Sequence, residues 1–422
     1  MGDYMFMLES HLGAEQFRVV GQMRQLAGEA GINLFLTGGA MRDILGGFPV
    51  RDLDFTIEGN ALKLAKVAEK KFGAKVVSTD ELRKSVELQF PGGVTAELGM
   101  AHQERFPKSG SKPQIAAATI YEDLRCRDFT VNAIALSLNK ASLGLPIDPA
   151  NGVGDTERKE LRAIHNYSFY DDPSRMFRLM RFKVRLGYSI DERTRLQYEN
   201  AREAGVLERV SPEALYAEFL QMANEPNSGD LIQLLADEKL IEILSPALAG
   251  PKLNMPVFTK LQKARQMVPF GADFHLNALP LFLNVLLEKL NPKERAAVCK
   301  AAEISKAEQS AAQKLDAIAK KLEKDLKNPK LVRPSQVFSL ISKALGEAVL
   351  FLLVHSDQRL VQDRLKNYFQ KYLPMAMEVT DESIAAAGVP PGTPKFAKAK
   401  EQAILTKLDA RPKKIPPPEA AP

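Results

Sequence analysis

Two predicted strands on either side of a glycine pair constrain this chain more than any other feature. The apolar run 34–36 predicts a short buried strand, and Gly38 and Gly39 follow it almost at once. Alternation of polar and apolar residues predicts a second, half-buried strand that carries Asp52 and Asp54. Because residues two positions apart on a strand share a face, we expect these two carboxylates to lie side by side.

The two aspartates point to a metal site. Carboxylates this close repel each other, a bound divalent cation relieves the repulsion, and hard oxygen ligands favour Mg²⁺ or Mn²⁺. A glycine turn lets a phosphate approach backbone N–H groups. A lone pair of aspartates is common, and a glycine pair is usually only a turn. Here Arg42 lies between the two features, and the combination predicts nucleotidyl transfer.

These residues also carry a family resemblance. The motif consists of Gly38, Gly39, Arg42, Asp43, Arg51, Asp52 and Asp54. It resembles the signature of the class II tRNA nucleotidyltransferase and bacterial poly(A) polymerase family. The resemblance implies that Asp52 and Asp54 are the catalytic, metal-binding residues, and that Gly38, Gly39, Arg42 and Asp43 bind the nucleotide.

Composition sets broad limits. The 422 residues are 45% hydrophobic and 26% charged, which is typical of a soluble chain with two to four domains. The net charge of +6 mildly favours a polyanionic partner. The two cysteines, Cys126 and Cys299, fit neither a disulfide scaffold nor a zinc site. Without a long apolar run or a secretory signal at the N-terminus, we expect a cytoplasmic protein and no membrane contact.

The first third of the chain predicts mixed α and β structure. We expect helices over 9–30 and 60–72 and strands over 74–78, 85–90 and 94–98. Phe17, Val20, Met23 and Ala27 are expected to form the buried face of the first helix.

Glu97 lies on the last of these strands. The resemblance implies that it is a third metal ligand or supports the first two. The alternative is an exposed strand glutamate.

The segment 101–119 is rich in Pro, Gly, Ser and Lys and predicts a mobile loop. Glu104 and Phe106 resemble the flexible loop with which family members select the last nucleotide. His102 stands where the family usually has arginine. The loop is not shortened, as it tends to be in enzymes that stop after two cytidines.

A second motif follows, and it resembles the family's Arg-Arg-Asp-Phe-Thr-x-Asn-Ala. Arg127 suits a triphosphate, because its guanidinium is a fork donor, and Asn132 suits a ribose hydroxyl. Asp128 belongs to the same motif, and Cys126 replaces the first family arginine. The alternative is an exposed helix start with Asp128 as its cap.

A third motif lies near residue 172. The family uses Glu-Asp-x-x-Arg as a protein template for the incoming base, and here Asp171 replaces the glutamate before Asp172 and Arg175. A carboxylate and a guanidinium together match the base-pairing edge of C or A. We expect a helix with Pro173 in its first turn and Asp172 as its N-cap, and Arg178 within reach of the phosphates. The alternative is a capping and salt-bridge cluster.

From residue 189 onward the pattern is almost entirely helical, with helices expected over 229–244, 258–267, 276–290 and 292–327. No His-Asp pair marks a phosphohydrolase module in 276–290. Two basic sets fit either a solvated face or phosphate contacts with tRNA. They are Lys314, Lys320, Lys321, Lys324 and Lys327, then Arg359, Arg364, Lys366 and Lys371.

Taken together, the sequence predicts an α+β fold, a small mixed-sheet nucleotidyltransferase head of the polymerase beta type followed by helical parts. We expect a catalytic head over 1–148, a neck with the base template over 149–210, a body over 211–330, a tRNA-binding tail over 331–410 and a disordered end over 411–422.

The resemblance implies addition of C and/or A from CTP and ATP to the tRNA 3′ end, complete or limited to the final A. The cofactor would be Mg²⁺, with Mn²⁺ as the other candidate, and the partner the tRNA acceptor end. Monomer and dimer stay open. The alternatives are a poly(A) polymerase, a CC-adding enzyme, an inactive RNA-binding paralogue and a helical scaffold with a small sheet.

Overall fold

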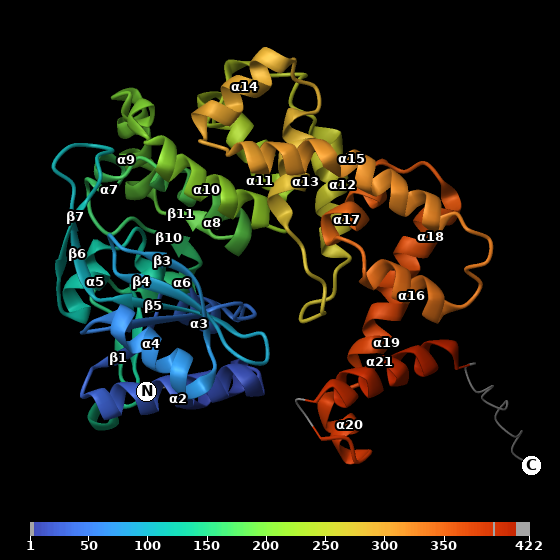
Figure 1. Cartoon of the computed structure of the whole chain (residues 1–422). Coiled ribbons are helices and arrows are strands. Elements are labelled where there is room, and N and C mark those ends of the chain that lie inside the picture. The colour runs from blue at the N-terminus through green and yellow to red at the C-terminus, as the bar shows by residue number, and fades with distance from the viewer. Residues whose placement is uncertain (1–3, 391–392, 411–422) are drawn as a thin grey trace, which may run out of the picture. The chain divides into compact units, whose positions relative to one another are not determined.

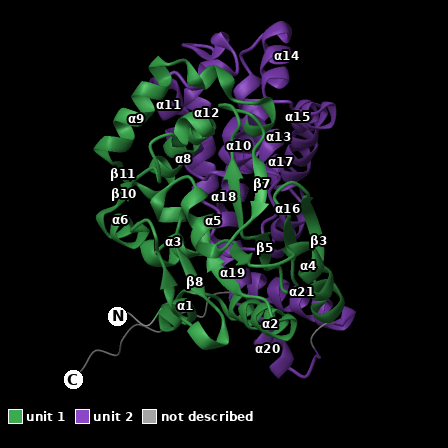
Figure 2. Cartoon of the chain, turned by 90° about the vertical axis from the view of Figure 1, so that its left-hand side faces the viewer, with its two compact units in different colours: residues 1–214 green, residues 215–422 purple. Residues whose placement is uncertain are grey.

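The computed structural model describes residues 4–390 and 393–410 (Figure 1). The predicted disordered end, 411–422, lies outside them. The chain divides into two compact units, Met1–Ala214 and Leu215–Pro422 (Figure 2).

A seven-stranded mixed sheet forms the centre of unit 1 within the described residues, in the order β3-β4-β5-β2-β1-β8-β9. Only β2 and β5 pair in parallel; the other neighbours are antiparallel. The strands are β1 Leu34–Thr37, β2 Leu53–Ile57, β3 Lys75–Asp80, β4 Ser85–Gln89, β5 Thr95–Met100, β8 Ala135–Ser137 and β9 Pro146–Ile147. The expected mixed-sheet head is confirmed.

Helices α2 (Ala14–Ala30) and α4 (Ala61–Phe72) pack together, and their apolar residues join the buried faces of the strands in one core. The predicted helix 9–30 is in fact two helices, since α1 (Tyr4–His11) ends before Gly13, which is extended at the start of α2. Val20, Met23 and Ala27 are buried as expected, but Phe17 is exposed.

The predicted mobile loop 101–119 is wrong. Its chain forms an antiparallel hairpin of β6 (His102–Arg105) and β7 (Gln114–Ala117), which rises from the sheet toward α7 (Ser168–Asp171) in Figure 1. None of the eight strand residues is buried. Period-2 hydrophobicity therefore cannot reveal such strands.

The rest of unit 1 is short helices with one small parallel ladder, β10 (Glu160–Leu161) with β11 (Ser189–Ile190). Its other elements are α3 Gly38–Gly46, α5 Ile120–Cys126, η1 Thr130–Asn132, η2 Lys140–Ser142, α6 Gly152–Arg158, α8 Arg175–Leu186, α9 Glu192–Glu203 and η3 Val206–Arg209. Helix α10 (Pro212–Asn224) begins in unit 1 and continues into unit 2.

The expected N-cap of α8 is wrong by two residues. Ser174 holds the cap position, and Asp172 is extended, with φ −129° and ψ 95°. A proline disfavours helical backbone in the residue before it, so Pro173 keeps Asp172 out of the helix. The Asp172 Oδ1 atom still accepts hydrogen bonds from the Ser174 N–H and hydroxyl, at 3.0 and 2.6 Å.

Unit 2 is helical throughout its described residues. Its elements are α11 Ser228–Asp237, η4 Ile241–Ile243, η5 Pro246–Leu248, α12 Met255–Gln266, α13 Ala278–Leu287, α14 Pro292–Ala301, α15 Lys306–Leu326, α16 Pro334–Ser342, α17 Gly346–His355, α18 Arg359–Asn367, the π-helix η6 Tyr368–Tyr372, α19 Leu373–Met377, α20 Asp381–Ala386 and α21 Pro394–Asp409. Helices α12, α13, α15 and α17 pack around buried aromatic and aliphatic side chains.

Two details of unit 2 differ from those expected from the sequence. The single helix 292–327 is divided between α14 and α15, because Glu303 takes a left-handed backbone (φ 48°) and Ser305 caps the next helix. Arg364 donates to the backbone carbonyls of Leu326, Asn328 and Leu331, so it fastens unit 2 internally.

Among the described residues, no single helix has the length and apolar character to cross a membrane. Only a pair bent by 114°, α16 and α17, passes the same test by length and composition.

Candidate functional site

The glycine pair begins helix α3 at the end of β1, and both glycines are closely packed against side chains of the site. Gly38 has a left-handed φ of 59°, and a Cβ there would lie 3.0 Å from an Arg127 nitrogen and 3.4 Å from Asp54 Oδ2. A Cβ on Gly39 would lie only 2.8 Å from Asp54 Oδ2. The N–H of Ala40 donates to the same oxygen at 3.2 Å. Thus Asp54 and Arg127, far apart in sequence, meet at the first turn of α3.

Asp54 sits among other carboxylates. It is the direct partner of Glu97 in the parallel register of β2 and β5. Burial, followed by the charges of Glu97 and Asp52, raises the pKa of Asp54 to about 7. Asp52 lies just before β2 and accepts a hydrogen bond from the Thr95 hydroxyl.

This donor set fits a divalent cation, because a cation beside Asp54 would offset the repulsion that raises its pKa. Among the described residues, no group of three or more His, Cys, Asp or Glu side chains is gathered closely enough to hold a metal ion. The role of Glu97 as a third ligand therefore stays a prediction.

Arg42 is buried beside this turn and is held on two sides. Its Nε donates to Asp43 Oδ1 and its Nη1 to Asn132 Oδ1, both at 2.8 Å. Its guanidinium also lies over the Phe182 ring, 5.1 Å from the ring centre. Asp43 in turn pairs with Arg185 at 3.3 Å. The geometry joins three predicted nucleotide-binding residues, Arg42, Asp43 and Asn132, in one network.

Asp128 extends this network toward α8. It accepts from Asn132 Nδ2 at 2.9 Å and from Arg178 Nε at 2.8 Å. Burial opposes its ionisation, but Arg178, Asn132 and Arg175 outweigh burial and hold the pKa of Asp128 well below its usual range. Because Asp128 is buried, the alternative of an exposed helix cap is wrong.

Arg127 reaches the site through Asp123, a residue that the motifs did not single out. Arg127 Nε and Nη2 donate to Asp123 Oδ1 at 3.0 and 2.8 Å, and Nη2 also reaches the Thr56 hydroxyl at 3.2 Å. The other oxygen of Asp123 accepts from the backbone N–H of His102 at 3.1 Å. The four-residue helical spacing between Asp123 and Arg127 is the signal that could have found this pair.

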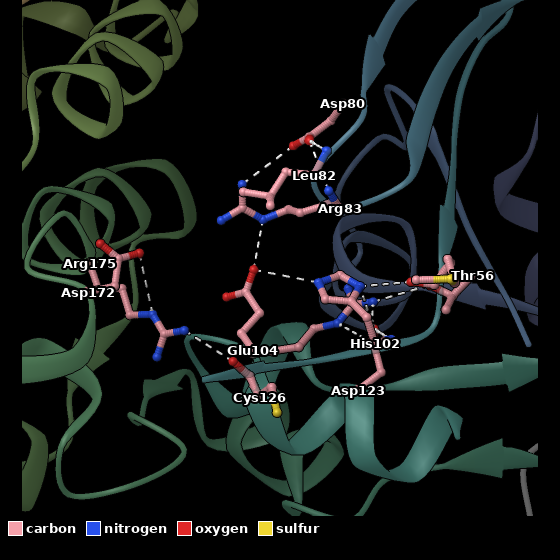
Figure 3. A network of polar contacts seen from close by, with 12 residues as sticks. Thr56, Asp80, Leu82, Arg83, His102, Glu104, Asp123, Cys126, Asp172 and Arg175 are labelled. Carbon is pink, nitrogen blue, oxygen red and sulfur yellow. Dashed lines mark hydrogen bonds and ion pairs between the residues drawn. The ribbon is translucent and has the colours of Figure 1, made fainter. Parts of the chain in front are cut away.

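Figure 3 shows how the β6–β7 hairpin is fastened at its base. Glu104 accepts from Arg83 Nε at 2.7 Å and lies 3.5 Å from His102 Nε2. Burial opposes the charge on Glu104, but His102 and Arg83 outweigh it and lower its pKa to about 2. Burial also opposes charge on His102, yet Glu104, the Met100 carbonyl and Asp123 raise the histidine pKa. A raised pKa favours the protonated form of His102, which carries the same sign of charge as the arginine that the resemblance expects here.

The expected template residues lie at the far end of this network (Figure 3). Arg175 is buried, and it donates to the Ser168 hydroxyl at 2.8 Å and to the Cys126 carbonyl at 3.1 Å. Its Nε lies 3.8 Å from Asp172 Oδ2. The hairpin reaches this segment too, because the Gly110 N–H donates to the Asp171 carbonyl at 3.2 Å. Cys126, in the place of a family arginine, contributes only its backbone carbonyl to Arg175.

Comparison with known proteins shows which proteins this chain resembles. Residues 34–162 match the family described as the poly(A) polymerase head domain. The A-adding tRNA nucleotidyltransferase of Aquifex aeolicus is 31% identical over 264 residues, which are 62% of this chain and 31% of that protein. The CCA-adding enzyme of Lactobacillus delbrueckii subsp. bulgaricus (strain ATCC BAA-365) is 28% identical over 64% of each chain.

The chain therefore spans about a third of the Aquifex relative and under two thirds of the Lactobacillus relative. A solved CCA-adding enzyme in complex with ATP has a similar fold, with a TM-score of 0.55, 25% identity and 97% and 93% of the two chains covered. Residues 34–162 thus match the poly(A) polymerase head domain, and the fold of the chain resembles that of a solved CCA-adding enzyme.

Proposed function

We propose that this protein is a tRNA nucleotidyltransferase that adds C and/or A from CTP and ATP to the 3′ end of tRNA. The observation that carries the proposal is the close packing of the glycine turn between Asp54 and Arg127. A carboxylate, a guanidinium and the backbone N–H groups of a helix start there face one small volume, which suits a metal-bound triphosphate. The names of the relatives support tRNA as the acceptor.

In this proposal Asp52 and Asp54 would hold Mg²⁺, or Mn²⁺ in its place. When bound, the ion lowers the pKa of the RNA 3′-hydroxyl and offsets negative charge on the triphosphate and on the departing pyrophosphate. The residues of the chain bind and orient. Arg127, positioned by Asp123, binds phosphate oxygens beside the first turn of α3. The nucleophile is the RNA hydroxyl, so no side-chain nucleophile is required.

The base would be read by Asp172 and Arg175. Asp172 Oδ1 is occupied by Ser174, which leaves Oδ2, near Arg175 Nε, as the acceptor for an exocyclic amine. Burial and the bonds to Ser168 and Cys126 fix the guanidinium of Arg175, so its remaining donors keep one direction. A rigid acceptor and donor pair suits C and A and disfavours G and U.

Arg42, Asn132, Asp128 and Arg178 would hold the sugar and phosphates as a single rigid group. The whole β6–β7 hairpin supports a protein that handles ATP, since enzymes limited to CC addition tend to have a shortened loop. We therefore favour complete CCA addition or addition of the final A over CC addition.

The domain roles are part of the same proposal. Residues 1–148 act as the catalytic head, 149–210 as the neck, and 211–330 and 331–410 as body and tail that hold tRNA in a cytoplasmic enzyme. The lysines of α15 are exposed and suited to phosphates. Arg364 is removed from the tRNA-binding set, because its donors serve backbone carbonyls.

One experiment tests the activity. Labelled CTP or ATP is offered with tRNA that ends before CCA, after the first C or after both Cs, and with an unrelated RNA. Incorporation of A alone into tRNA ending in CC identifies an A-adding enzyme, and stepwise addition to all three identifies a CCA-adding enzyme. Long tails on the unrelated RNA would show a poly(A) polymerase, and no incorporation into any substrate would refute the proposal.

A further inference from the structure

Unit 1 contains a cavity whose lining includes none of the predicted site residues. Its volume is about 440 Å³, which lies in the range of pockets that bind small ligands. It is lined by the end of α5, the segment 162–166 and the start of α9. Three arginines and one aspartate are its charged residues, namely Arg125, Arg162, Arg193 and Asp191.

The lining carries an excess of positive charge. Asp191 is already used, because its Oδ2 accepts from the Thr194 N–H at 3.1 Å and its Oδ1 lies 3.3 Å from Arg162. Burial and the nearby Arg175 lower the pKa of His165, which therefore adds no positive charge at neutral pH. Arg193 donates to the Asn166 side chain at 2.6 Å, a neutral partner that leaves its charge uncompensated. The pocket is thus suited to an anion.

Two buried polar atoms in the lining have no hydrogen-bond partner. One is the donor Arg162 Nε, whose nearest charge is Asp155 Oδ2 at 3.5 Å, and the other is the acceptor Gln197 Oε1. Buried polar groups are rarely left without a partner. Because Arg162 Nε already faces Asp155, Gln197 Oε1 is the atom that lacks a partner, and a ligand that presents an anionic oxygen to the arginines and a hydroxyl group to Gln197 fits this lining. A nucleotide unit of RNA, with its phosphate and ribose 2′-hydroxyl, has this combination.

The pocket adjoins the proposed base-reading segment. His165 Nε2 lies 3.8 Å from Asp171 Oδ2, and Arg125 is the neighbour of Cys126, whose carbonyl holds Arg175. Arg127, two residues after Arg125, is turned toward Asp54 and the glycine turn. The stretch 125–127 therefore places Arg125 in the lining of the cavity and Arg127 beside the glycine turn.

We propose that this pocket binds one nucleotide unit of the RNA substrate, through its phosphate and ribose, beside the base-reading segment. The inference rests on the proposed function and adds an RNA contact to it. Arg125 and Arg193 hold the phosphate, and Gln197 accepts from the ribose hydroxyl. A free nucleotide offers the same phosphate, so the experiment separates RNA from free nucleotide.

The test compares the full-length protein with Arg125→Ala, Arg193→Ala, the double variant and Gln197→Leu. Arg195→Ala is the matched control, because it removes the same charge from the same helix and does not line the pocket. Binding of labelled tRNA lacking CCA is measured by fluorescence anisotropy at several salt concentrations. Binding of labelled ATP is measured in parallel.

We expect the double variant to weaken tRNA binding at least about tenfold more than the control and to lower the salt slope by about one, the value for one lost phosphate contact. Gln197→Leu is expected to weaken binding about threefold with an unchanged salt slope, since it removes a neutral acceptor. ATP affinity should not change in any of them.

Wild-type affinity and slope in the double variant would overturn the proposal, and so would a loss of ATP binding with tRNA binding intact. Circular dichroism and thermal unfolding first show that each variant is folded, and Arg125→Gln with Arg193→Gln, which also removes both charges, replaces a variant that is not. The proposed function fails separately, if the wild-type protein binds tRNA but incorporates no nucleotide.

Discussion

The two units differ in what they bury. Unit 2 buries mainly apolar side chains, and among its described residues Glu218 and Glu225 are the buried charged ones. Unit 1 buries a larger charged set, which consists of Arg42, Asp43, Asp123, Asp128, Asp155, Arg175 and Arg181. A buried charge costs several kcal/mol unless it is paired and hydrogen-bonded. Five of the seven in unit 1 belong to the networks around the candidate site, so pairing within these networks offsets the cost of burial and holds the charges in a fixed arrangement.

The largest expected effect is on the rate of nucleotide incorporation. Asp54→Ala should reduce nucleotide incorporation more than about a thousandfold while tRNA affinity stays near normal, because the carboxylate is required for metal binding and not for RNA contact. Incorporation of labelled ATP into tRNA ending in CC is the measurement. Glu203→Ala, at an exposed position of α9 in the same unit, is the control. Retained incorporation would contradict the assignment of Asp54 to the metal.

Next in size is a stability effect inside unit 1. Asp128→Ala removes one partner of a buried ion pair and leaves Arg178 and Asn132 without their acceptor, so the free energy of unfolding should fall by about 3 kcal/mol. Hydrogen exchange should show the loss of protection in α8 and not in α13. If protection falls equally in both units, then the network does not stabilise unit 1 by itself.

The pH dependence of stability should also differ between the two units, because Asp54 lies in unit 1. Asp54 has a pKa of about 7 in the folded state, above its ordinary value of 3.8, so the folded state binds this proton more tightly. Its contribution is complete below pH 3.8 and is lost as pH rises to about 7, with a slope of at most about 1.4 kcal/mol per pH unit and less after solvent screening.

Thermal unfolding between pH 5 and 8 without divalent cations tests this slope. Asp54→Asn should flatten it, and added Mg²⁺ should reverse the loss at pH 8. A slope that is identical in Asp54→Asn and in the wild type would assign the effect to another group.

The smallest effect is expected on the surface of unit 2. Lys320 is exposed and pairs with Asp316 at 2.7 Å, so Lys320→Ala should change stability by less than about 0.5 kcal/mol. Because we propose that Lys320 contacts tRNA, the substitution should weaken tRNA binding a few-fold and in a salt-dependent way. Binding isotherms at two salt concentrations provide the check. A stability loss above about 2 kcal/mol would mean that this lysine is structural.

Strands β8 and β9 of unit 1 were not predicted, but β1, β2, β4 and β5 were predictable, β1 as an apolar run and the others because polar and apolar residues alternate in them. The hairpin was not, since its composition resembles that of a loop and its strand residues are only partly covered. Asp123 and Arg83 were missed because their roles depend on partners that only folding brings close. In unit 2, apolar periodicity predicted helices, but it could not show the interruption at Glu303 or the inward use of Arg364.

The hairpin β6–β7 connects Arg127 and Asp171, which belong to two separate sequence motifs. Its base shares Asp123 with Arg127, and its turn is bonded to the carbonyl of Asp171. The proposed phosphate-binding and base-reading sites then both depend on the free energy of ordering this hairpin. A ligand bound at one site therefore changes the affinity for a ligand at the other. A base that disturbs residue 171 would therefore be rejected through weaker positioning of its triphosphate, and discrimination would be seen in the rate of transfer as well as in binding.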